Sequence, residues 1–120
     1  MDIICCRSRE DVALAAFRLR YQVYGAEIGV DDAAIDHERK IYTDEFDAVA
    51  RIYVAIKDGA AIATCRSVYD RDYDFRRDLP RSVFDMLGLE KFLKEHAGTL
   101  AISTKFAISP SHRIWISILT

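Results

Sequence analysis

The sequence predicts a mixed α+β domain, with a mainly antiparallel sheet and flanking helices. Residues 49–68 contain two alternating apolar segments joined by Asp58-Gly59, a dipeptide typical of a two-residue β-hairpin turn. Residues 8–25 carry apolar side chains at helical spacing, and the apolar segment 100–108 follows a second helical region. The order of strand, helix, hairpin, helix and strand is typical of a mixed architecture, and 120 residues predict one domain over 1–120.

The first part of the chain predicts a short apolar strand over Asp2–Cys6 and then a long helix. Ser8 is the expected N-cap of this helix, and Gly25 is expected near its end. The predicted core stripe of the helix consists of Val12, Ala16, Leu19 and Val23. Residues 29–48 are polar and acidic, so we expect mostly loop there, with a short helix over 32–39.

The second part of the chain predicts antiparallel strands over 49–56 and 61–68, followed by a charged loop over 69–80. A helical region over 82–96 is expected to divide at Gly88 and to end at Gly98. The last predicted strand covers 100–108. A Ser109-Pro110 break and the first turn of another helix follow it.

The composition argues against several classes of function. A net charge of −2 provides no electrostatic basis for nucleic-acid binding, and the lack of a run of about 18 apolar residues predicts no membrane span. Met1-Asp2-Ile3 does not resemble a signal peptide, and three cysteines fit a reducing, cytoplasmic environment. No metal site is predicted, because no CxxC pair or His pair is present. Cys65 is a weaker alternative as an acyl-accepting nucleophile.

Charged residues at three places suggest one site. Arg20 and Tyr24 lie four residues apart and share a helix face, where the alternative for Arg20 is a surface salt bridge. Asp44 and Asp47 precede the hairpin and could receive an arginine or orient an amine; the alternative is an ordinary Asp-rich turn. Arg66 is expected on an apolar strand face, where its charge needs a partner. We therefore predict an Arg20–Asp47–Arg66 network.

The last predicted strand offers a second group of polar side chains. Thr104 supplies a hydroxyl and Lys105 supplies a charge next to it. The alternative is a strand with one solvated face. Asp47 is the candidate base that helps to deprotonate an amine, and Thr104 is the second catalytic candidate.

These motifs in this order resemble the GNAT acyltransferase superfamily, with its three-layer fold, and more closely its acyl-homoserine-lactone synthase and N-acyl amino acid synthase branch. The resemblance covers nearly the whole chain. Its motifs are Leu19-Arg20-x-x-Val23-Tyr24-x-x-Glu27-x-Gly29, Asp44-x-Phe46-Asp47, Tyr53-Val54-Ala55 followed by Asp58-Gly59 and Cys65-Arg66, and Ile102-x-Thr104-Lys105-Phe106-Ala107-Ile108.

The resemblance implies an enzyme that moves an acyl group from a thioester to the amine of a small molecule such as an amino acid. It implies that the donor is an acyl-carrier-protein or acyl-coenzyme A thioester and that no cofactor is tightly bound. The amine side would be formed by Arg20, Tyr24, Asp44, Arg66 and Lys105, and the donor side by Phe106, Ala107, Ile108 and Arg113.

The chain departs from the family pattern at several positions. Ile102 replaces a glutamate, Lys105 replaces an arginine, and residues 114–118 replace an expected Gly-rich turn, which favours a carrier-protein donor or none. The family fold normally continues past this point, so we expect a chain that is truncated after its first half. A second hypothesis is therefore an inactive half-domain that acts as a binding or assembly module. The apolar residues of 114–119 would then favour self-association.

Overall fold

The computed structural model of the chain describes residues 1–6, 9–74 and 80–113. The larger elements are β1 (Asp2–Cys5), α1 (Glu10–Arg20), β4 (Arg51–Lys57), β5 (Ala60–Tyr69), α2 (Arg81–Met86), α3 (Leu89–Glu95) and β6 (Ala101–Ile108). The shorter ones are the π-helix η1 (Tyr21–Ile28), strands β2 (Ile35–Asp36) and β3 (Ile41–Tyr42), and the 3₁₀ helices η2 (Glu45–Ala48) and η4 (Pro110–His112). The predicted α+β class is confirmed.

The main sheet has four antiparallel strands in the order β1-β4-β5-β6, and β2 and β3 form a separate two-stranded sheet. The predicted hairpin between β4 and β5 is confirmed. Asp58 and Gly59 both have positive φ angles, 51° and 76°, as a two-residue hairpin turn requires. Among the described strands, β6 lies at one edge of the main sheet.

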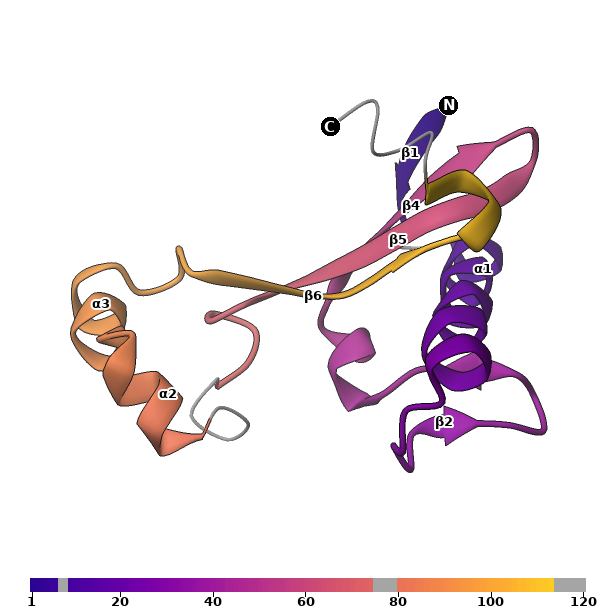
Figure 1. Cartoon of the computed structure of the whole chain (residues 1–120). Coiled ribbons are helices and arrows are strands. Elements are labelled where there is room, and N and C mark those ends of the chain that lie inside the picture. The colour runs from indigo at the N-terminus through magenta and orange to yellow at the C-terminus, as the bar shows by residue number, and fades with distance from the viewer. Residues whose placement is uncertain (7–8, 75–79, 114–120) are drawn as a thin grey trace.

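Helix α1 covers one face of the sheet, as Figure 1 shows. Val12 and Ala16 of the helix pack against Ile52 and Val54 of β4. One turn further along, Leu19 and Val23 form a second apolar cluster around Ala107 of β6. The predicted core stripe of the helix is therefore confirmed, and it places the end of α1 next to β6.

The α2–α3 hairpin lies at the far end of the long β5–β6 arm, away from α1 (Figure 1). The Asp70 carboxylate closes the base of this segment, since it accepts hydrogen bonds from the backbone N–H groups of Gly98 at 2.7 Å and Leu100 at 3.1 Å. Gly88 separates the two helices in a left-handed conformation with φ 64°. The predicted division at Gly88 is thus confirmed.

Two expectations about the first half of the chain are wrong. The helix does not end near Gly25 but continues as η1 to Ile28, and Gly29 ends it with φ 74°. Gly25 serves close packing instead, because a Cβ atom there would lie 2.8 Å from the Tyr21 ring and 3.2 Å from the Ile35 side chain. Residues 32–39 form a turn and β2 rather than a helix. Of the described helices, none is long and apolar enough to cross a membrane.

Ser8, the expected N-cap, and residues 114–120, the expected apolar end, lie outside the described residues.

Candidate active site

The segment Asp44-x-Phe46-Asp47 is folded into a compact turn. Asp44 is the N-cap of η2, and its carboxylate accepts a hydrogen bond from the Phe46 backbone N–H at 3.0 Å. The Asp47 carboxylate reaches back and accepts from the Asp44 N–H at 2.9 Å and from Thr43 Oγ1 at 2.9 Å. This reciprocal capping fixes both carboxylates. The three-residue spacing is therefore needed for geometry as well as for charge.

Arg20, the last residue of α1, reaches this turn from the helix. Its Nη1 atom donates to both oxygens of Asp47, at 2.9 and 3.0 Å. The Arg20 side chain is 1% exposed, so the alternative of a surface salt bridge is wrong. A buried guanidinium without a counter-charge is strongly unfavourable, which makes Asp47 essential to this position.

Arg66 approaches the same turn from β5. Its Nη1 and Nη2 atoms donate to the two oxygens of Asp44, and Nη1 also donates to Asp47 Oδ1 at 3.1 Å. Its Nε atom donates to Thr104 Oγ1 on β6 at 3.1 Å. The predicted Arg20–Asp47–Arg66 network is present, and it includes Asp44 and Thr104.

The charges of this cluster compensate each other. Burial by itself would raise the pKa of Asp47, but the Arg20 charge, the Asp44 backbone N–H and the Arg66 charge outweigh it and hold that pKa below its usual value. Burial by itself would lower the pKa of Arg66, but its contacts with Asp44 and Asp47 raise it. Both shifts favour the ionised forms of Asp47 and Arg66.

Strand β6 carries a β-bulge beside this cluster. Thr64 pairs with Ala107 and Arg66 pairs with Thr104, so Cys65 alone faces both Lys105 and Phe106. Lys105 has φ 56°, a left-handed conformation that is uncommon for lysine. The bulge interrupts the regular ladder at the strand where the family resemblance implies donor binding.

Tyr24 and Tyr42 connect the bulge to the rest of the site. The Tyr24 hydroxyl donates to the Phe106 carbonyl oxygen at 2.6 Å, and its ring lies edge-on to Tyr42. Tyr42 is 3% exposed, and its hydroxyl donates to Asp32 Oδ2 and accepts from Lys105 Nζ, both at 2.5 Å. Sequence reasoning did not select Tyr42 or Asp32. The only sequence feature that pointed to Tyr42 was its position in the short apolar segment Ile41-Tyr42 of an otherwise acidic loop.

These observations agree with the comparison to known families. A family model described as an acetyltransferase (GNAT) domain matches residues 19–117, which include the whole charged cluster and the bulge. The chain belongs to this GNAT family. No curated protein and no solved structure matches the chain. GNAT enzymes are acyltransferases that use acyl-coenzyme A as cosubstrate and hold no cofactor tightly.

The residues expected on the donor side, Phe106, Ala107, Ile108 and Arg113, lie on β6 or shortly after it. An apolar hollow of about 230 Å³ is lined by residues of β1, β4, β5 and β6, which include Tyr53, Cys65, Phe106 and Ile108. Arg113, which follows β6, donates two hydrogen bonds to Glu27 of η1, at 2.6 and 2.8 Å. The Arg113–Glu27 pair joins the end of η1 to the chain that leaves β6.

Cysteine chemistry gains little support from the structure. Burial raises the pKa of the Cys65 thiol, which reduces the fraction of reactive thiolate. Burial first, and then the Cys5 charge, raise the pKa of Cys6 to about 11. Within residues 1–6, 9–74 and 80–113, no group of three or more His, Cys, Asp or Glu side chains is placed to hold a metal ion.

Proposed function

We propose that this GNAT domain is an N-acyltransferase. It moves an acyl group from an acyl-carrier-protein or coenzyme A thioester to the amine of a small molecule such as an amino acid. The observation that carries the proposal is the buried cluster of Arg20, Asp47, Arg66 and Asp44, which meets the bulged strand β6 through Thr104. The motifs that form this cluster resemble the N-acyl amino acid synthase branch.

The geometry supports a division of the site into two sides. The charged cluster and Tyr24 would form the amine side, where fixed charges orient a polar acceptor. Phe106, Ala107 and Ile108 would form the donor side, where the apolar hollow suits an acyl chain and the β6 backbone suits a pantetheine arm. Strand β6 is common to both sides. An amine and a thioester bound there would meet at the bulge.

The geometry favours a positioning role for Asp47 over the base role that its sequence suggests. Its carboxylate accepts hydrogen bonds from Arg20, Arg66, Thr43 and the Asp44 backbone. A carboxylate with a lowered pKa and saturated oxygens is a weak proton acceptor. We propose that Asp47 fixes the two arginines. The Thr104 hydroxyl accepts from Arg66 and can donate its own hydrogen to the thioester oxygen.

The proposal is tested by product formation. The purified chain is incubated with an amino-acid mixture and with acetyl-coenzyme A, a long-chain acyl-coenzyme A or the matching acyl-carrier protein. Mass spectrometry then detects the amide, and a thiol reagent measures release of the carrier. The three donors separate an acetyltransferase from a long-chain enzyme and from a carrier-protein enzyme. No amide with any donor would contradict the proposal and favour a binding module.

A matched pair of variants connects activity to the cluster. Arg66→Lys keeps the charge but removes the fork that binds Asp44 and reaches Thr104, so we expect kcat/KM to fall about 10- to 100-fold. Arg9→Lys makes the same exchange in an exposed pair with Asp11 and should leave kcat/KM unchanged. Equal activity of the two variants would show that the cluster is not part of the active site.

A further inference from the structure

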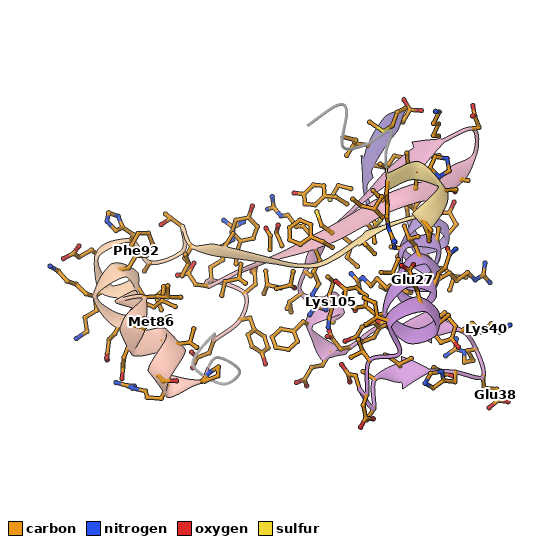
Figure 2. The ribbon with its side chains drawn as sticks, viewed as in Figure 1. Glu27, Glu38, Lys40, Met86, Phe92 and Lys105 are labelled. Atoms are coloured by element: carbon orange, nitrogen blue, oxygen red, sulfur yellow. The ribbon has the colours of Figure 1, made fainter. Side chains whose placement is uncertain are left out.

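Lys105 occupies a backbone conformation that needs an explanation. It is the residue at which the β5–β6 register shifts, and its φ of 56° is unfavourable for a side chain with a Cβ atom. Such strain persists where the surrounding structure requires it, often at functional sites. Here the bulge turns the Lys105 side chain towards the α1 side of β6, as Figure 2 shows.

The Lys105 amine lies in a small aromatic and acidic enclosure. Its Nζ atom is 4.3 Å from the centre of the Tyr42 ring and 6.0 Å from that of Tyr24, and it donates to the Tyr42 hydroxyl. That hydroxyl in turn donates to Asp32, whose other oxygen accepts from the Ala34 N–H at 2.9 Å. The chain Lys105–Tyr42–Asp32 is therefore a continuous path of hydrogen bonds.

The groups around Lys105 differ in their ability to release a proton. Arg66 on β5 and Arg20 on α1 are held by carboxylates and remain charged. Burial and the Arg66 charge lower the pKa of Lys105, against the opposing effect of Asp44 and Asp32. Lys105 is thus the basic side chain of this cluster whose pKa is lowered, while its Nζ atom lies against the Tyr42 hydroxyl.

We propose that the Lys105 amine accepts the proton that the acceptor amine loses during acyl transfer, and that Tyr42 and Asp32 position it. This inference rests on the proposed N-acyltransferase function. The acceptor nitrogen forms a bond to the thioester carbon, and the C–S bond breaks with its electron pair on sulfur. The proton moves from the acceptor nitrogen to Nζ, and Nζ then returns one proton to the thiolate. The products are an amide and a free thiol.

The competing role for Lys105 is that of a permanent cation that binds a substrate carboxylate. The two roles differ in the variant Lys105→Arg, because arginine keeps the charge and cannot act as a base at ordinary pH. A base role predicts that kcat falls about 100-fold or more while KM changes little. An anchor role predicts that kcat is kept. Lys94→Arg, on the exposed surface of α3, is the matched control.

The pH profile of kcat/KM tests the path of hydrogen bonds. Tyr42→Phe removes an acceptor of the Lys105 ammonium and Asp32→Asn removes a negative charge, so both should lower its pKa and shift the acid limb to lower pH. Circular dichroism checks that each variant is folded. Full kcat in Lys105→Arg, or an acid limb that neither variant moves, would overturn the proposal.

A titration without turnover separates this proposal from the proposed function. The chain is labelled with ε-¹³C lysine, and the Lys105 signal is assigned by its loss in Lys105→Arg. We expect the wild-type signal to titrate below the usual lysine range and to move further down in Tyr42→Phe. A titration at the ordinary value, near pH 10.4, would refute the base role even if the enzyme is active. An ordinary Lys105 pKa in the NMR titration would thus refute the base role, whereas the absence of an amide product would refute the proposed N-acyltransferase function.

Discussion

Asp47→Asn is the most direct test of the buried cluster, because Asp47 is shared by both arginines. Asparagine has the same shape, but it carries no charge and offers one acceptor oxygen in place of two. Arg20 would lose its counter-charge while remaining 1% exposed, and its Nε and Nη2 atoms have no hydrogen-bond partner among the described residues. Leaving a buried charge uncompensated costs about 3–5 kcal/mol of the free energy of unfolding.

The assay is urea unfolding at pH 7, followed by circular dichroism, with two controls. Asp44→Asn should cost less, about 1–3 kcal/mol, because its side chain is 20% exposed and Arg66 retains Asp47. Glu38→Gln changes an exposed acid and should have no measurable effect. This order of the three variants follows from burial and from the number of shared partners.

A double variant distinguishes loss of charge pairing from simple damage to the turn. Arg20→Met removes the buried positive charge that Asp47→Asn would leave without a counter-charge. The two substitutions together should therefore destabilise the fold less than the sum of their separate effects. Strict additivity would show that Arg20 and Asp47 do not interact in solution. An Asp47→Asn protein as stable as wild type would refute the whole electrostatic argument.

Three further predictions concern stability. The pKa of Asp47 is lowered in the folded state, so its stabilisation is complete above about pH 4 and is lost as the pH falls through the lowered value; urea midpoints of wild type and Asp47→Asn should converge there. Ile62→Ala, at a fully buried position, should cost about 2–5 kcal/mol in the same unfolding assay. Gly29→Ala, at φ 74°, should cost about 1–2 kcal/mol and lower the melting temperature; no change would show that η1 does not require this left-handed end.

The parts of the fold that could be predicted are those whose sequence pattern and environment agree. The β4–β5 hairpin combines alternating apolar residues with the Asp58-Gly59 turn, and both features act locally. The end of the first helix could not be placed from the sequence. Glycine commonly ends a helix, but Gly25 lies inside η1, where its lack of a side chain leaves room for the Ile35 side chain. The β2–β3 pair consists of two-residue strands, which carry no periodicity to detect.

The charged cluster was predictable because buried charge needs a partner. Arg66 alternates with apolar residues on β5, so a counter-charge had to come from elsewhere in the chain, and the Asp44–Asp47 turn supplied it. Tyr42 and Asp32 could not be found in this way. Their contacts depend on the loop between η1 and η2 folding back against β6, which no local pattern specifies.

Position 105 carries a lysine where the family pattern has an arginine, and the structure suggests a reason for this difference. On sequence alone, it is a departure that weakens a bidentate contact. In the structure, the site already contains two fixed guanidinium groups, and a third fixed cation beside Arg66 would add repulsion. In the proposed mechanism, a lysine relieves that repulsion by releasing its proton, and its hydrogen-bond path to Tyr42 and Asp32 favours the return of the proton. The substitution therefore replaces a permanent charge with a titratable one at the strand where donor and acceptor would meet.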